Sequence, residues 1–259
     1  MNLKYLFGAI VSVPLLPIMA YQGKKIRKSV PSLPEAEGTQ GISTCVSKKT
    51  IRMIAIGEST IAGVGVATHE EGYTGTLAKE LAERLGVNIE WRVYARNGYT
   101  VERLTKKILP KIEEKRADLI VIGTGGNDAF KLNTPKQFYQ NILQLIDNLQ
   151  VKFPNTPIVF TNVPPIKEFP AFTPLIKFTI GNLGEILGEE LEKAVSKRQN
   201  VYFIAEKITL NKWIKKMNIS ADEKDFFSDG VHPSKLTYQT WAKDTAMFIV
   251  ENSQILTLV

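Results

Sequence analysis

Five short, mainly apolar runs recur along this chain, with stretches of helical periodicity between them. Runs of this length, four to six residues, are typical of strands that are buried on both faces of a sheet. Because a helical stretch follows each run, the pattern predicts an α/β fold with a mostly parallel sheet covered by helices on both sides. The expected strands are residues 51–56, 89–94, 119–122, 158–162 and 201–204.

The helical stretches carry apolar residues three and four positions apart, as an amphipathic helix does. The pattern is clearest in residues 135–152, where Phe138, Ile142 and Leu145 repeat at this spacing. Ser234 is a favourable N-cap for the last helix. The segment 205–225 is expected to be irregular or partly helical. The expected helices are residues 73–85, 101–115, 135–152, 175–198 and 234–252.

The N-terminal region differs in composition from the rest of the chain. Residues 3–21 are apolar apart from Lys4 and Ser12, and a run of this length lies at the lower edge of what crosses a bilayer. The residues that follow are basic, then rich in proline and serine, as in a linker. We therefore divide the chain into a hydrophobic membrane anchor or signal peptide (1–22), a linker (23–50) and one α/β domain (51–259).

The charges beside the apolar run predict its orientation. Lys24, Lys25, Arg27 and Lys28 follow the run instead of preceding it. By the positive-inside tendency, a membrane anchor with this flank would keep the domain on the cytoplasmic face. Ile18 occupies a position where a cleavage site needs a small residue, which argues against removal. An exported or periplasmic domain remains the alternative.

The overall charge excludes some classes of function. The formal net charge is +7, but seven lysines and arginines lie in residues 1–50 against two glutamates there. The domain itself is nearly neutral, which argues against a nucleic-acid partner. Two histidines and the single Cys45 provide neither an intramolecular disulfide nor a His/Cys metal cluster. Gly63-x-Gly65 lacks the third glycine of a dinucleotide fingerprint, so we expect no cofactor and no metal.

One loop near the end of the domain contains a carboxylate and a histidine. His232 has Asp229 three positions before it, with Gly230 to allow a sharp turn and Pro233 to stiffen the exit. Such a loop can hold an imidazole against a carboxylate, and an oriented imidazole can take a proton from a serine hydroxyl. The other histidine, His69, lies in a Glu-rich loop and is expected to be solvated.

Four polar clusters follow strands or precede the last helix. The carboxyl ends of parallel strands lie at one edge of a sheet, where open α/β folds bind their ligands. The clusters are Gly57-Glu58-Ser59, Asn97-Gly98, Gly125-Gly126-Asn127-Asp128 and Asp229-Gly230-Val231-His232. In order and spacing, they resemble those of the SGNH (GDSL-like) hydrolase family over about residues 51–250. The resemblance implies a flavodoxin-like three-layer α/β/α sandwich with a five-stranded parallel sheet.

The same resemblance implies a role for each residue. Ser59 would be the nucleophile, His232 the general base and then acid, and Asp229 the residue that orients the imidazole. The backbone N–H groups of Ser59 and Gly98, with the Asn127 side-chain amide, would form an oxyanion hole. Asp128 is expected to be a structural partner of its loop.

This chain departs from the family pattern at one position. The family's first block usually reads Gly-Asp-Ser, and here Glu58 stands in place of the aspartate. If the acid mainly organises the turn, one extra methylene should be tolerated. Thr60 and Ile61 follow the serine, so the Gly-x-Ser-x-Gly elbow of α/β-hydrolases is absent.

The expected function is hydrolysis of carboxylic (acyl) esters through an acyl-enzyme on Ser59, as in carboxylesterases and lysophospholipases. Phe169, Phe172 and Ile166 of the loop 164–174 would supply apolar pocket walls, and the membrane anchor makes lipid or lysophospholipid esters attractive substrates. The alternatives are an O-acyl or acetyl transferase or deacetylase acting on a carbohydrate, and a catalytically silent membrane-tethered binding module. The sequence leaves open the acyl length, the leaving group and the oligomeric state.

Overall fold

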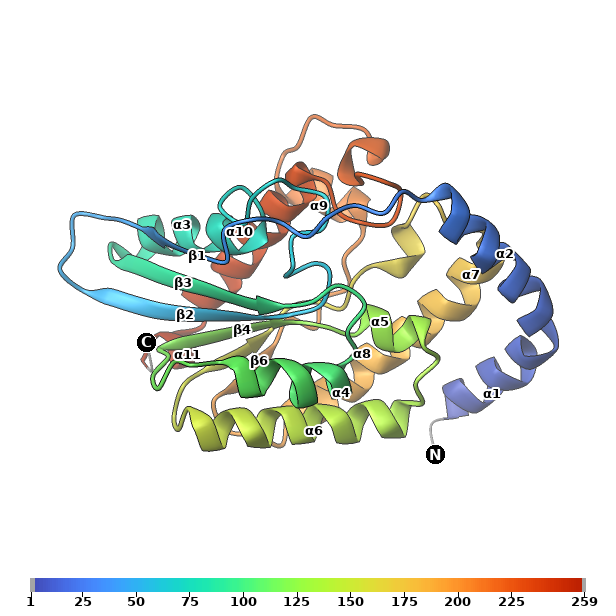
Figure 1. The fold of residues 1–259 in the computed structure, drawn as a ribbon, viewed down its shortest axis with the longest axis horizontal. Helices are drawn as coiled ribbons and strands as arrows, with labels where there is room; N and C mark the ends of the chain where they lie inside the picture. The colour runs from blue at the N-terminus through green and yellow to red at the C-terminus, as the bar shows by residue number, and fades with distance from the viewer. Residues whose placement is uncertain (1–2, 258–259) are drawn as a thin grey trace.

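The computed structural model describes residues 3–257, in which a six-stranded sheet lies between two layers of helices (Figure 1). The strand order is β1-β3-β2-β4-β5-β6. The five strands from β2 to β6 run parallel to one another, and their order is that of flavodoxin-like folds. The strands are β1 (Gln40–Ser43), β2 (Thr50–Gly57), β3 (Asn88–Ala95), β4 (Leu119–Gly123), β5 (Ile158–Phe160) and β6 (Val201–Phe203).

The five predicted strands are confirmed, but the prediction of a sheet with five strands was wrong by one. The sixth strand, β1, comes from the region expected to be a linker, and it pairs antiparallel with β3. It is an edge strand held by backbone hydrogen bonds, and its one large apolar side chain, Ile42, is 54% exposed. Since edge pairing needs no burial pattern, the sequence contains no alternation that would reveal it. Gly41 lies opposite Trp91 and leaves room for the indole ring.

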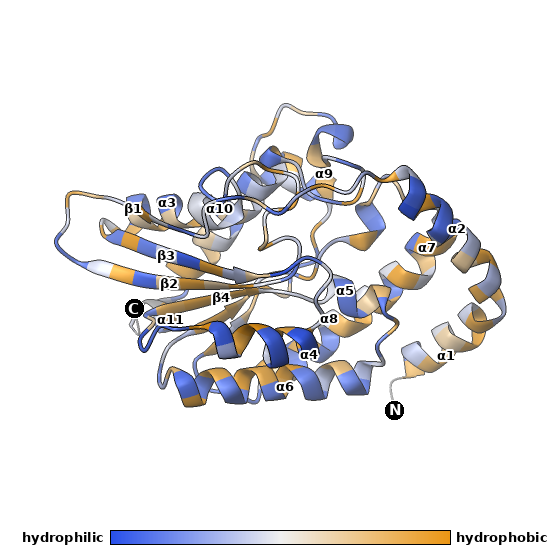
Figure 2. Cartoon of the chain, in the orientation of Figure 1, coloured by the Kyte–Doolittle hydropathy of each residue, from blue (hydrophilic) through white to orange (hydrophobic). Residues whose placement is uncertain are grey.

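Successive residues of the central strands face opposite layers, as the pleat of a strand requires. Ile54 and Ile56 of β2 belong to the core under α6 (Pro135–Lys152) and α8 (Asn182–Val195). Met53 and Ala55 belong to the other core, under α3 (Tyr73–Leu85) and α10 (Lys235–Glu251). Figure 2 shows hydrophobic colour along the inner strands and hydrophilic colour on the outer side of α6. The predicted three-layer sandwich is confirmed.

Two of the predicted helices are interrupted. Residues 101–111 form α4 (Val101–Arg103), a π-helical turn (η2, Leu104–Ile108) and a 3₁₀ turn (η3, Leu109–Lys111) that contains Pro110. A second π-helical turn (η5, Lys177–Gly181) separates α7 (Pro174–Ile176) from α8. The shorter elements are α5 (Gly126–Phe130), η4 (Ile166–Glu168), α9 (Leu210–Lys216), η6 (Glu223–Phe226) and α11 (Ser253–Leu256).

The N-terminal residues form a curved helical arm at one end of the molecule (Figure 1). It consists of α1 (Leu3–Ser12), η1 (Val13–Leu15) and α2 (Leu16–Ser29). By length and composition this stretch could cross a membrane, and a signal sequence near an N-terminus would meet the same criteria. Met19 is its one buried residue.

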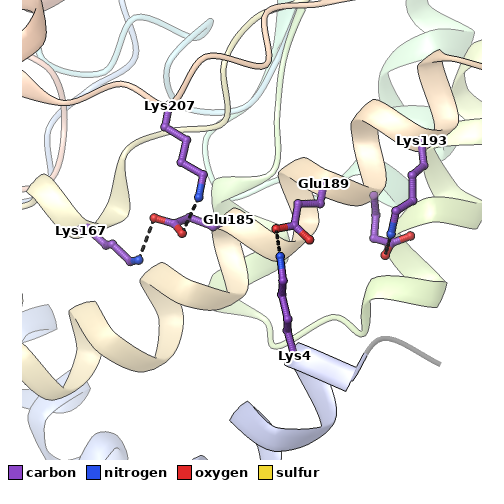
Figure 3. A network of polar contacts seen from close by, with 7 residues as sticks. Lys4, Lys167, Glu185, Glu189, Lys193 and Lys207 are labelled. Atoms are coloured by element: carbon purple, nitrogen blue, oxygen red, sulfur yellow. Dashed lines mark hydrogen bonds and ion pairs between the residues drawn. The ribbon is translucent and has the colours of Figure 1, made fainter.

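Ion pairs connect the arm and two loops to α8, as Figure 3 shows. Lys4 of α1 lies 2.7 Å from Glu189. Glu185, one turn earlier, accepts from Lys167 at 2.7 Å and from Lys207 at 2.8 Å. Burial alone would raise the pKa of Glu185, but the two lysines together lower it. Because these pairs are partly exposed, each stabilises the arrangement only weakly.

Candidate active site

The loop before α10 holds His232 against Asp229. One carboxylate oxygen, Oδ2, lies 2.7 Å from His232 Nδ1, and the other accepts the backbone N–H groups of Val231 and His232 at 2.9 and 2.7 Å. The Asp229 side chain has no exposed surface, whereas that of His232 is 19% exposed. Burial alone would raise the pKa of Asp229, but these hydrogen bonds, above all that with the imidazole, lower it. The carboxylate therefore stays ionised and fixes the orientation of the ring.

Gly230 makes this loop possible in two ways. Its φ of +84° lies in the left-handed region that favours glycine. A Cβ at this position would lie 3.0 Å from the Cβ of Ala171, whose N–H donates to the Gly230 carbonyl at 3.0 Å. The histidine loop is thus joined to the loop 164–174 across the mouth of the site.

Ser59 lies in the turn that follows β2, and it is half-buried. The turn is fixed by backbone hydrogen bonds, from Glu58 N–H to Gly123 and from Val64 N–H to Ser59. Ser59, Asn127 and His232 line the same pocket. Within residues 3–257 no hydrogen bond joins the Ser59 hydroxyl to the imidazole. Catalytic hydrogen bonds of this kind often tighten only when substrate is bound.

Glu58 connects the first polar cluster to the third. Its Oε1 accepts the backbone N–H of Gly126 at 2.9 Å, and its Oε2 accepts both the backbone N–H and the side-chain Nδ2 of Asn127 at 2.9 Å. The side chain is 1% exposed. Burial raises the pKa of Glu58 to about 8, although the Asn127 and Gly126 donors oppose the shift. The glutamate thus positions Asn127, and at neutral pH it does so mainly as a neutral acid.

Asp128 connects the third cluster to the second. Its buried carboxylate accepts the backbone N–H of Val101 at 3.0 Å and the side-chain amide of Asn133 at 2.7 Å. Val101 begins α4, directly after the loop that contains Gly98. The expectation that Asp128 is a structural partner of its loop is confirmed.

Gly98 lies in a turn at the rim, with a φ of +76°. Asn97 lines the pocket that contains Ser59 and His232, and Gly98 does not. The loop is supported from outside by Glu35, whose carboxylate accepts the Asn97 N–H at 2.7 Å and the Arg96 guanidinium at 3.0 Å. The sequence analysis missed Glu35 because it lies in the expected linker, far from any strand end.

The sequence profile of the GDSL-like lipase/acylhydrolase family matches residues 55–240, a segment that contains all four polar clusters. The chain belongs to the GDSL-like lipase/acylhydrolase family. The resemblance drawn from the sequence is therefore confirmed. A search of curated proteins finds no significant match.

Solved structures share the fold of this GDSL-like domain. TesA is 16% identical, with a TM-score of 0.57 over 78% of this chain and 99% of its own. A family 3 carbohydrate esterase from Clostridium thermocellum is 19% identical, with a TM-score of 0.56 over 78% and 96%. A lipase/acylhydrolase from Enterococcus faecalis is 19% identical, with a TM-score of 0.53 over 78% and 96%. At identities this low, the TM-scores show a shared fold alone.

Aromatic side chains form much of the pocket wall in this GDSL-like domain. Phe169 lines it as predicted, and its ring lies 5.7 Å from that of Phe227 and 5.3 Å from that of Phe172. Phe172 lines an adjoining groove, and Ile166 is buried and lines neither. The sequence analysis did not identify five other large apolar side chains of the wall, which are Phe130, Leu210, Trp213, Phe227 and Trp241.

The prediction that His69 is solvated was wrong. Its side chain is buried, with 3% of the residue exposed, and its backbone N–H donates to the Glu37 carbonyl at 2.8 Å. A bridge between Glu37 and Thr68 brings the segment before β1 over this loop. Burial lowers the pKa of His69 to about 4, against a small opposing effect of Glu35. His69 is therefore a neutral structural residue.

In the described part of the chain, no group of three His, Cys, Asp or Glu side chains could hold a metal ion.

Proposed function

We propose that the protein hydrolyses carboxylic esters through an acyl-enzyme on Ser59. The observation that carries the proposal is one pocket lined by Ser59, Asn127 and His232, with His232 held by a buried carboxylate. Membership of a lipase/acylhydrolase family supports the same class of reaction.

In this mechanism His232 Nε2 takes the proton of the Ser59 hydroxyl while the serine oxygen attacks the ester carbonyl carbon. Asp229 keeps the other ring nitrogen, Nδ1, protonated and stabilises the imidazolium. The tetrahedral intermediate collapses as the alcohol leaves with the proton from His232. Water then attacks the acyl-enzyme with His232 again as base, which releases the acid and restores Ser59.

The negative charge of the intermediate needs fixed donors. Among residues 3–257 neither the Ser59 nor the Gly98 N–H donates a hydrogen bond to another group of the chain. Asn127 Nδ2 uses one hydrogen on Glu58, which leaves the second for the oxyanion. One such donor is typically worth about 3–4 kcal/mol of transition-state stabilisation.

The test uses the full chain in detergent, with short p-nitrophenyl esters and a fluorophosphonate label. Wild type should turn over the ester and carry the label on the peptide that contains Ser59. Ser59→Ala should lose the label and fall by about a thousandfold or more in kcat, while Ser196→Ala, on the exposed end of α8, should behave as wild type. Equal rates for wild type and Ser59→Ala would refute the esterase proposal.

The second candidate is removal or transfer of an acetyl group on a carbohydrate. It is favoured by the fold shared with a carbohydrate esterase and by a pocket of only about 60 Å³, which suits a short acyl group. Product analysis with acetylated sugars, with and without an alcohol acceptor, separates hydrolysis from transfer.

We further propose that the N-terminal arm anchors the protein in a membrane with its domain on the cytoplasmic face. The support is the apolar stretch Leu3–Ser29 and the basic residues at its C-terminal end. Export, with the domain on the other face, is the alternative.

A further inference from the structure

The pocket that contains Ser59 is open on one side and closed on the other. Asn127 and His232 line both the pocket and the adjoining groove, so the pocket is open on this side. Leu210 and Trp213 of α9 line the pocket but not the groove. Both side chains are buried, and they form part of the wall on the closed side.

The proposed mechanism decides which half of an ester meets this wall. His232 has to protonate the departing alcohol, so the alcohol lies on the side of the imidazole and the open groove. The acyl group extends from the other side of the carbonyl carbon. It therefore points away from the groove, toward α9.

Trp213 is a single side chain between two cavities. On one side it lines the pocket, which encloses about 60 Å³. On the other side it lines an outer hollow of about 400 Å³, which is formed by α9, residues 206–209, Asn162 and Asp244. Among the described residues, Trp213 alone lines both cavities. Removal of most of the indole would therefore join them.

Contacts at both ends of α9 hold this wall in place. The Trp213 ring lies 5.9 Å from that of Trp241, whose indole N–H donates to Asn162 Oδ1 at 3.0 Å. The Asn162 amide in turn donates to a backbone carbonyl in the segment before α9, at 2.7 Å. At the C-terminal end of α9, Lys216 pairs with the buried Asp244 of α10. A bulky acyl group cannot displace the indole without disturbing these contacts.

We propose that Trp213 limits the length of the acyl group. Its indole closes the acyl end of the pocket, so acetyl and similarly short groups fit and long chains do not. A longer chain would need the space of the outer hollow, which the indole blocks. This inference rests on the proposed esterase activity of Ser59.

The test is a change of preference, which a loss of stability alone does not produce. We compare kcat/KM for p-nitrophenyl octanoate and p-nitrophenyl acetate in the full chain in detergent. Trp213→Leu should raise the octanoate-to-acetate ratio by about tenfold or more. Trp91→Leu is the matched control, because Trp91 is an equally buried tryptophan of the same core that lines neither cavity. It should leave the ratio near wild type, since weaker packing lowers both rates together.

The fluorophosphonate label on Ser59 reports the folded fraction of each variant. An unchanged ratio in Trp213→Leu that still takes the label would overturn the proposal, and so would an equal change in Trp91→Leu. Trp213→Phe, which keeps an aromatic ring in the core, should give a smaller increase and replaces Trp213→Leu if that variant does not fold.

Wild type alone provides a further check. Equal rates of wild type on the octanoate and the acetate would overturn the length limit and leave the esterase proposal standing. If wild type and Ser59→Ala cannot be told apart on the acetate, the esterase proposal itself fails.

Discussion

At the scale of single residues, Glu58 determines the charge of the proposed oxyanion hole. Its carboxyl contacts Asn127 directly, and burial raises its pKa to about 8. At neutral pH the site therefore carries little negative charge where the intermediate needs to develop one. Above about pH 8 an ionised Glu58 would oppose that charge.

This arrangement predicts a pH dependence of catalysis. Ester hydrolysis by wild type should decline as the pH rises through about 8. Glu58→Gln, which keeps the shape and the neutral state of the side chain, should lack this decline. The measurement is kcat/KM for a short ester from pH 6 to 10, and an identical alkaline decline in both proteins would contradict the prediction.

The same group predicts a pH dependence of stability. From about pH 4.5 to about 8 the folded protein keeps a proton on Glu58 that the unfolded chain releases. The free energy of unfolding should therefore be highest below this window and fall across it, by a few kcal/mol at about 1.4 kcal/mol per unit of pKa. Urea unfolding at pH 5 and pH 9 should show a smaller loss for Glu58→Gln than for wild type.

Much of the candidate site could be predicted residue by residue. Asp229 and His232 are three positions apart, so one loop brings them together, and strand ends place Ser59 and Asn127 at one edge. The contacts of Glu58 with Gly126 and Asn127 link distant parts of the chain, and no local pattern reports them. The prediction for His69 failed for a similar reason, because the segment that buries it lies some thirty residues earlier.

At the scale of elements, the segment before β1 supports the edge of the sheet that carries the candidate site. Glu35→Ala removes the acceptor for Asn97 and Arg96, so the Gly98 loop should loosen. We expect kcat on a short ester to fall several-fold and stability to fall by about 1–2 kcal/mol.

Glu37→Ala is the matched control for this prediction. Glu37 lies two positions away, and its contacts in the described chain are made by its backbone. Equal kinetics for the two variants would show that Glu35 does not support the loop.

A truncated chain that begins after residue 44 would lose both Glu35 and β1, so we expect it to be less active than one that begins at residue 31.

The elements differ in how well their sequence reveals them. Residues 135–152 form a helix with the predicted bounds, because a continuous apolar stripe faces the core. The two π-helical turns depend on tertiary packing, which periodicity does not describe. Strand β1 has no buried face to produce a pattern.

At the scale of the whole molecule, one residue of the chain can test the proposed membrane anchor and its orientation. Cys45 is the single cysteine and is exposed, between the basic flank of the arm and β2. If the domain faces the cytoplasm, a membrane-impermeant maleimide should label Cys45 only after cells are permeabilised. Cys45→Ser provides the unlabelled control. Labelling of intact cells would favour the exported alternative.

The architecture was predictable at this scale because alternating strands and helices leave few arrangements of a parallel sheet. The position of the arm was not, because α2 meets the domain through the buried Met19 and the half-buried Gln22 and Ile26, in a stretch whose composition suits a membrane segment equally well.

The meeting of Ser59 and His232 has a consequence for how the protein is made. The strand that leads to the serine, β2, is synthesised early, and the loop that contains the histidine follows only after all six strands of the sheet have been synthesised. By the proposed mechanism, a nascent chain on the ribosome carries the serine hydroxyl without its base. Such a chain could not hydrolyse esters until synthesis is nearly finished and the last helix docks.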